Sequence, residues 1–92
     1  MITYDFTKKA KKQLNKLPLD IQRRIVKKID AYCSYSDPLN SAKHLVTVDG
    51  RFYRYQIGNY RAIFRLERDS ILFTKIEHRG SVYQRRFWSL FL

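Results

Sequence analysis

Arginine and tyrosine gather in one stretch of the chain, from Arg51 to Tyr83, and their types could support chemistry on a phosphodiester. Guanidinium groups offer a planar fork of donors that matches phosphate oxygens, and they can stabilise the extra charge of a pentavalent transition state. In RNA, the ribose 2′-hydroxyl is a nucleophile tethered beside the phosphorus, so positioning supplies much of the rate. Such a set of side chains could cleave RNA without a metal ion.

This chemistry also needs a group that moves a proton, and arginine cannot easily do so because its pKa exceeds about 12. We consider Tyr83 and His78 for this role. A phenol of pKa about 10 is a weak base at neutral pH, although nearby arginines would lower that value. Tyr83 could instead stack on a base, which needs only a π face. The pKa of His78 is more suitable, but the sequence pattern does not fix the face on which it lies.

The best-determined element around these residues is a β-hairpin. Two alternating segments, Phe52–Ile57 and Tyr60–Leu66, flank Gly58-Asn59, a pair that suits a two-residue turn. The register then places Gln56 opposite Arg61 and Arg54 opposite Ile63. One face of the predicted hairpin carries Phe52, Arg54, Gln56, Arg61, Ile63 and Arg65. The other carries Tyr53, Tyr55, Ile57, Tyr60, Ala62, Phe64 and Leu66. We call Arg54, Gln56, Arg61 and Arg65 the arginine face, and we expect the second set to pack on helices.

The segments around the hairpin predict its scaffold. Ile2–Phe6 alternates as a short strand, and Thr7 can cap a helix over Lys8–Leu17. A second helix, about Leu19–Ser34, follows Pro18, and both helices carry apolar stripes. Ser70–His78 reads as a third strand after the hairpin, but its consecutive apolar residues leave its register open. The fold class is therefore α+β, in the order β-α-α-β-β-β with a short C-terminal segment, and the antiparallel strands form a small twisted sheet.

Composition and charge agree with a folded domain that binds a polyanion. The 92 residues predict a single domain, 1–92, and the net charge of +11 favours a nucleic-acid partner. Residues 1–50 hold eight lysines and two arginines, whereas residues 51–92 hold eight arginines and one lysine. Lysine on helices usually indicates a solvated face, so we place the functional surface in the second half. Its three acids are too few to neutralise nine basic groups.

Other chemistries find little support in the sequence. Cys33 lies on the apolar stripe of the second helix, which favours a buried small residue over a nucleophile. His44 lies in Ala42–Val48, a segment that could be a helical turn or a strand, and it has no evident orienting partner. We expect no metal site and no cofactor. No signal peptide or membrane span is predicted, so we expect a cytosolic protein.

Several motifs, taken in order, resemble the RelE/ParE superfamily of toxin–antitoxin toxins. They are L-x-x-L-P at residues 14–18, Asp37-Pro38, and Y-R-Y-Q-I-G-N-Y-R-A-I-F at residues 53–64. The ending H-R-x-x-V-Y, residues 78–83, is similar to the RelE branch in particular. The resemblance covers about residues 2–86, and the ordered set is more specific than any single motif.

The resemblance implies a small toxin that enters the ribosomal A site and cuts mRNA, leaving a 2′,3′-cyclic phosphate and a 5′-hydroxyl. It assigns catalytic roles to Arg54, Arg61, Arg79 and Tyr83. We predict that Gln56, Arg65 and His78 contribute to substrate binding. Gln56 departs from the pattern, because RelE proteins often carry two lysines on this strand. Either the site is weaker or Arg65 or His78 compensates for the missing cation.

The resemblance also implies partners and leaves alternatives. A cognate antitoxin is expected to cover the basic surface with an acidic or amphipathic segment, and the 70S ribosome and mRNA are the expected targets. The chain could instead be a ParE-like inhibitor of DNA gyrase, or a non-catalytic RNA-binding protein. The apolar tail, Phe87–Leu92, either folds back as core or belongs to a patch that a partner covers.

Overall fold

The computed structural model describes residues 2–35, 37–45 and 50–78, and it confirms the α+β fold class. Its elements are β1 (Thr3–Phe6), α1 (Lys8–Asn15), α2 (Leu19–Cys33), a 3₁₀ helix η1 (Pro38–Ser41), β2 (Ala42–His44), β3 (Phe52–Ile57), β4 (Tyr60–Leu66) and β5 (Ser70–His78). Arg79, Tyr83 and the tail Phe87–Leu92 lie outside the described residues, so the predictions that concern them stay predictions.

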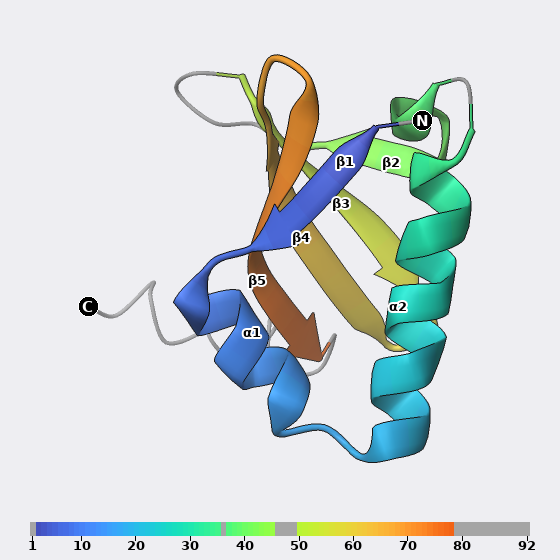
Figure 1. Ribbon diagram of the computed structural model, residues 1–92, viewed down its shortest axis with the longest axis vertical. Coiled ribbons are helices and arrows are strands. Elements are labelled where there is room, and N and C mark those ends of the chain that lie inside the picture. Colours follow the sequence, from blue (N-terminus) through green and yellow to red (C-terminus); the bar gives the residue numbers. More distant parts are fainter. Residues whose placement is uncertain (1, 36, 46–49, 79–92) are drawn as a thin grey trace.

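The strands form one twisted, mixed sheet in the order β1-β5-β4-β3-β2, with both helices on the same side (Figure 1). The strands β2 to β5 pair antiparallel, as predicted for β3 to β5, whereas β1 pairs parallel with β5. The alternation of β1 fixes which side chains face the helices, but both strand directions satisfy it, so the sequence could not set this direction. The ambiguous segment after η1 supplies the three-residue edge strand β2.

The β3–β4 hairpin has the predicted bounds and register. Gln56 pairs with Arg61 and Arg54 with Ile63, around a turn in which Gly58 has a φ of +58°. Residues without a Cβ adopt this left-handed conformation without steric cost, so the turn depends on this glycine. The two faces separate as expected, because Tyr55, Ile57, Ala62 and Phe64 are all buried.

The register of β5, which the sequence left open, contains a β-bulge. Phe64 pairs with Phe73 but Ile63 pairs with Lys75, so Thr74 is the extra residue on β5. The hydroxyl of Thr74 donates to the Ile63 carbonyl at 3.4 Å. The bulge resets the alternation along the strand. As a result Ile71, Phe73 and Ile76 all face the helices, while Lys75 and Glu77 turn to the arginine face.

The core lies between the helices and the sheet. Thr7 caps α1 by accepting from the Ala10 amide at 3.1 Å, as predicted, and the apolar stripes of both helices pack on the strands. The core residues are Ala10, Leu14, Ile25, Ile29, Cys33, Tyr55, Ile57, Ala62, Phe64, Ile71, Phe73 and Ile76. Within the described part of the chain, no helix is long and apolar enough to cross a membrane.

The hairpin turn allows a direct test. Gly58→Ala should lower the free energy of unfolding by about 1–2 kcal/mol, because a Cβ strains the left-handed backbone. A steric clash would not contribute, since this Cβ would lie 3.6 Å from Arg24 Nη1, an ordinary contact. Gly58→Asn should lose less, because asparagine tolerates this conformation better. Urea denaturation of the three proteins measures the difference, and equal losses in both variants would contradict the assignment.

Candidate functional site

Three residues of the arginine face lie together at the turn end of the hairpin. Gln56 is directly opposite Arg61, and Arg54 lies diagonally from Arg61 because its own partner is Ile63. Diagonal neighbours in an antiparallel pair have Cα atoms roughly 7–8 Å apart, within reach of long side chains. The two guanidinium groups can therefore approach the same phosphate. The predicted grouping of these three residues by geometry is confirmed.

Arg65 belongs to the same face but has a different environment. It lies four residues along β4 from Arg61, which corresponds to roughly 13 Å of strand. Its Nη2 lies 2.7 Å from Glu67 Oε1, and its Nε donates to the same oxygen at 2.9 Å. A salt bridge with Glu67 is the alternative to a role of Arg65 in binding, and the structure shows this salt bridge. The charge of this arginine is thus largely compensated within the protein.

Arg61 contrasts with Arg65. Its Nε is buried, and among the described residues it has no hydrogen-bond partner. A buried donor without a partner costs about 1–3 kcal/mol, and such sites in native proteins often have a functional reason. Its neighbour across the strand is Glu77, a carboxylate only 8% exposed, whose Oε1 lies 3.8 Å from Lys75 Nζ. Sequence reasoning missed Lys75 and Glu77 on this face, because only the bulge at Thr74 places them there.

Gln56 is held by a network of three hydrogen bonds. Its Oε1 accepts from Arg54 Nη1 at 3.0 Å, while its Nε2 donates to the carbonyls of Gly58 at 2.7 Å and Tyr60 at 3.2 Å. The side chain therefore connects the hairpin turn to Arg54. The sequence predicted a substrate-binding role for Gln56, and this network within the protein was not anticipated.

His78 lies on the other face of the sheet. It pairs with Tyr60, whose side chain faces the helices, and the two rings meet edge to face with centroids 5.1 Å apart. His78 is exposed at the end of β5 and Arg61 is on the opposite face. The structure thus brings Arg54, Gln56 and Arg61 together, places Arg65 further along the same face and separates His78 from them.

Raised pKa values mark groups on the helix side of the sheet, in the core or packed against it. Burial raises the pKa of the Cys33 thiol, which disfavours the thiolate and supports its assignment as a buried structural residue. Burial also raises the pKa of Tyr55, whose hydroxyl donates to the Pro38 carbonyl at 2.8 Å. Burial, together with a hydrogen bond to Asp30, raises the pKa of Tyr4 to about 12. None of these groups is on the arginine face.

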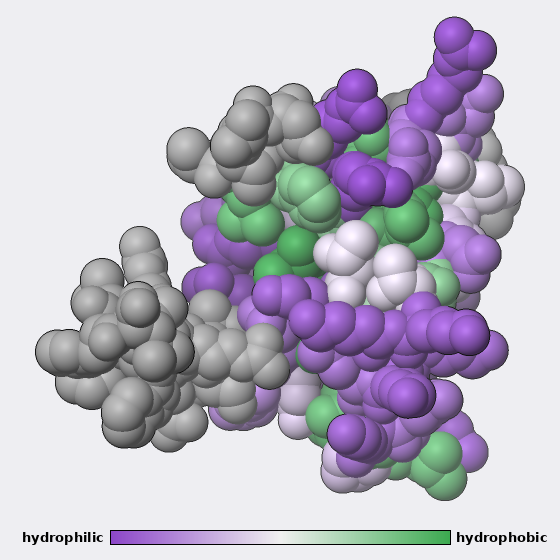
Figure 2. All heavy atoms as spheres, turned by 90° about the vertical axis from the view of Figure 1, so that its left-hand side faces the viewer, coloured by the Kyte–Doolittle hydropathy of each residue, from purple (hydrophilic) through white to green (hydrophobic). Residues whose placement is uncertain are grey.

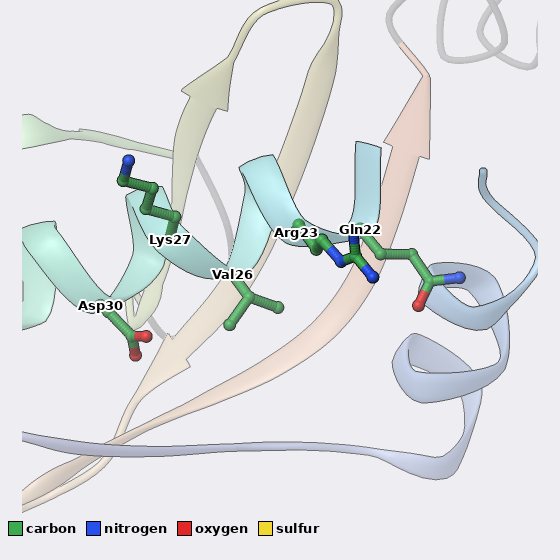
Figure 3. Close-up of a pocket in the computed structure, with 5 residues that line it drawn as sticks. All are labelled: Gln22, Arg23, Val26, Lys27 and Asp30. Carbon is green, nitrogen blue, oxygen red and sulfur yellow. The ribbon is translucent and has the colours of Figure 1, made fainter. Parts of the chain in front are cut away.

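Two hollows lie away from the cluster of Arg54, Gln56 and Arg61. One, of about 410 Å³, follows α2, where Val26 lies between Gln22 and Asp30 (Figure 3). The other, of about 560 Å³, lies where β3 begins and β4 ends, and it is lined by Gly50, Arg51, Tyr53, Leu66, Glu67 and Arg68. In the described residues, no group of three or more His, Cys, Asp or Glu side chains could hold a metal ion.

The helices present a second basic surface. Figure 2 shows hydrophilic side chains gathered across the lower part of one side of the molecule, where α1 lies. The exposed cations of the two helices are Lys8, Lys9, Lys11, Lys12, Arg23, Arg24, Lys27 and Lys28. This agrees with the predicted solvated face. The site on the sheet differs from the helix surface because Arg54, Gln56 and Arg61 are grouped across two paired strands and Gln56 is hydrogen-bonded to Arg54.

Fold and site together define a class of protein. It is a small α+β domain with an arginine cluster on the outer face of its sheet. The model of a family described as the ParE toxin of a type II toxin–antitoxin system, parDE, matches residues 4–83. A curated relative, Toxin RelE3 of Methanocaldococcus jannaschii, is 36% identical over 81 residues, which cover 85% of this chain and 91% of the relative.

Solved structures give the same result. A chain of the RelB-RelE antitoxin-toxin complex from Methanococcus jannaschii is similar with a TM-score of 0.64 and 29% identity, over 87% of this chain and 95% of that one. A chain of the archaeal RelE-RelB complex from Pyrococcus horikoshii OT3 is similar with a TM-score of 0.68 and 25% identity, over 86% of this chain and 96% of that one. This chain therefore belongs to the RelE/ParE family of toxins from type II toxin–antitoxin systems, and the resemblance inferred from its motifs is confirmed.

The unpartnered Nε predicts a stability effect at the site. Arg61→Met should raise the free energy of unfolding by about 1 kcal/mol, because it removes a buried donor without a partner and one of several neighbouring cations. Arg65→Met removes the same kind of side chain but breaks the pair with Glu67, so it should lower stability by less than about 1 kcal/mol. Chemical denaturation at constant ionic strength measures both values. A larger loss with Arg61→Met than with Arg65→Met would show that Arg61 is a structural residue.

Proposed function

We propose that this toxin is a ribosome-dependent endoribonuclease that cuts mRNA in the ribosomal A site. The observation that carries this proposal is the arginine cluster itself. Arg54 and Arg61 lie diagonally on one face, and the Nε of Arg61 has no partner among the described residues, in contrast to Arg65. An arginine whose Nε makes no hydrogen bond within the described residues, next to a second arginine on the same face, is suited to a charge that develops on a bound phosphate.

The proposed reaction is an internal transfer followed by release. The ribose 2′-oxygen attacks the adjacent phosphorus, the bond from phosphorus to the 5′-oxygen breaks, and the products are a 2′,3′-cyclic phosphate and a 5′-hydroxyl. Arg61 and Arg54 stabilise the added negative charge of the pentavalent transition state. One group accepts the 2′-hydroxyl proton and another supplies a proton to the leaving 5′-oxygen.

The position of His78 bears on which group moves these protons. Because His78 lies beside Tyr60 on the helix side of the sheet, its placement favours Tyr83 over His78 as the titratable group for the arginine face. Arg79 is the further cation that the family resemblance assigns to the site. We therefore include proton transfer by Tyr83 and charge stabilisation by Arg79 in the proposed mechanism.

We propose two kinds of partner for this toxin, an antitoxin and the ribosome with its mRNA. The two similar solved chains come from RelB-RelE complexes, so we propose that a cognate antitoxin neutralises this toxin. Its contact segment should be acidic or amphipathic, because the toxin carries a net charge of +11. The ribosome and its mRNA are the proposed targets, and a highly basic surface suits a polyanionic assembly of this kind.

A second candidate function deserves a test because the matching family model describes ParE toxins. A ParE-like protein would inhibit DNA gyrase by binding a protein and would need no arginine cluster for chemistry. Purified toxin should be assayed in parallel for cleavage of a defined mRNA on ribosomes and for inhibition of gyrase supercoiling. Gyrase inhibition without RNA cleavage would replace the endoribonuclease proposal.

Arg61→Ala should abolish growth arrest on expression and lower the cleavage rate on ribosomes by roughly 10²–10³, because one donor to the transition state is lost. Tyr83→Phe should also slow cleavage if the phenol moves a proton, and it should have little effect if the ring only stacks. The matched control is Arg68→Ala, which removes an exposed arginine from the β4–β5 turn at the far end of the sheet.

The sites of cleavage should be mapped with the chemistry of the new ends. A 2′,3′-cyclic phosphate at the upstream fragment supports attack by the 2′-hydroxyl. Equal loss of activity in Arg61→Ala and Arg68→Ala would indicate a general effect of charge on RNA binding and would remove Arg61 from the catalytic role. Folding of each variant is checked by thermal unfolding.

A further inference from the structure

The amide of Gln56 is engaged on both of its sides. Its nitrogen donates to the Gly58 and Tyr60 carbonyls, at 2.7 and 3.2 Å, and its oxygen accepts from Arg54 Nη1 at 3.0 Å. These partners leave one orientation for the amide, since carbonyls accept hydrogen bonds and a guanidinium donates them. The direction of the Gln56 side chain is therefore fixed by chemistry as well as by shape.

The network ties one candidate catalytic residue to the most constrained part of the hairpin. Gly58 has a left-handed φ of +58°, and Tyr60 is the first residue of β4. Gln56 is itself paired with Arg61 across the strands. A glutamine held by the turn thus places its oxygen beside Arg54, on the same face and next to Arg61.

A neutral acceptor has a particular consequence for Arg54. Glu67 holds Arg65 with a carboxylate and compensates its charge, whereas the Gln56 amide orients Arg54 with a hydrogen bond and adds no negative charge. A guanidinium whose direction is already set can stabilise a developing anion with little reorganisation. The two arrangements on one sheet face suit different tasks, because a salt bridge holds Arg65 at one end and a neutral amide orients Arg54 at the other.

We propose that Gln56 is a positioning residue that orients Arg54 from the hairpin turn, and that it does not stand in for a missing cation. This inference rests on the proposed endoribonuclease function and identifies how one of its arginines is held. It replaces the substrate-binding role predicted for Gln56 from the sequence. It also explains why a glutamine can occupy a position where a lysine was expected, because a lysine has no acceptor to offer Arg54.

Gln56→Lys separates the two interpretations. Its ammonium could still donate to the turn carbonyls, but it would repel Arg54 and could not accept from it. If Gln56 positions Arg54, kcat for ribosomal mRNA cleavage should fall about tenfold, while KM should stay the same or fall because the face gains a cation. If Gln56 merely lacks a useful charge, Gln56→Lys should raise kcat. An increase in kcat would overturn the proposal.

Gln56→Met removes the network without changing charge. Here we expect kcat to fall about fivefold to tenfold, because the contact with Arg54 is lost. KM should stay nearly unchanged, because no contact with RNA is lost. A rise in KM at unchanged kcat would show that Gln56 binds RNA directly, which contradicts the positioning role. In an Arg54→Ala background, Gln56→Met should cause no further loss, whereas full additivity of the two changes would also contradict it.

Gln22→Met is the matched control. Gln22 on α2 also donates through Nε2 to two backbone carbonyls, Asn15 at 3.2 Å and Leu17 at 2.8 Å. The two variants lose similar bonds to the backbone, but Gln22 has no place on the arginine face. Gln22→Met should therefore leave kcat unchanged. An equal decrease in both variants would point to general loss of stability.

An NMR measurement on the toxin without RNA tests the positioning role of Gln56 independently of the proposed endoribonuclease function. The guanidinium signals of Arg54 in ¹⁵N NMR report rotation about its Cζ–N bonds, which should be at least twofold faster in Gln56→Met than in the wild type. The Gln22→Met control should show no change. If the wild type cuts no RNA on ribosomes, the endoribonuclease proposal fails, and the NMR comparison still decides whether Gln56 positions Arg54. Unchanged Arg54 rotation in Gln56→Met would overturn the inference.

Discussion

The hairpin of β3 and β4 depends on an alternation that buries one set of apolar side chains and turns the set containing the arginines outward. Tyr55, Ile57, Ala62 and Phe64 are almost completely buried on one face, while Arg54, Gln56 and Arg61 project from the other. A slip of one residue would expose the first set and drive the second into the core. Each large apolar side chain contributes about 1.5–3 kcal/mol by burial, so the register is strongly determined. The position of the arginine cluster is thus a consequence of core packing.

The sheet face also shows how a protein with few acids distributes them. Glu67 neutralises Arg65 at one end of β4, and Glu77 lies opposite Arg61 and within 3.8 Å of Lys75. Arg54 is instead joined to a neutral amide. Glu67 and Glu77 thus lie at opposite ends of β4, beside Arg65 and Arg61 respectively. Arg54 and Arg61 lie diagonally from each other at the turn end of the hairpin, an arrangement of two cations that suits the recognition of an anion.

Much of this fold could be predicted because local rules agree with each other. Thr7 as a cap, Pro18 between the helices, and the Gly58-Asn59 turn each gave an element whose first residue or register the structure confirms, although α1 ends at Asn15 and not at Leu17. The β5 register was beyond reach, because a β-bulge depends on packing from several elements. Thr74 illustrates this, since its hydroxyl reaches the Ile63 carbonyl and its own carbonyl accepts from the Thr7 hydroxyl at 3.5 Å. The direction of β1 likewise depends on a distant strand.

The candidate site also has a part that the sequence could predict and a part that required the structure. Grouping Arg54, Gln56 and Arg61 needed only the alternation of one hairpin, so the sequence was sufficient. Placing Glu77 and Lys75 on that face, and His78 on the opposite one, required the bulge. The positioning role that we propose for Gln56 needed side-chain geometry, because its spacing is compatible with a substrate contact as well as with an internal network. The alternation in the sequence therefore grouped Arg54, Gln56 and Arg61, while the hydrogen bonds that join Gln56 to Arg54 and to the turn became visible only in the structure.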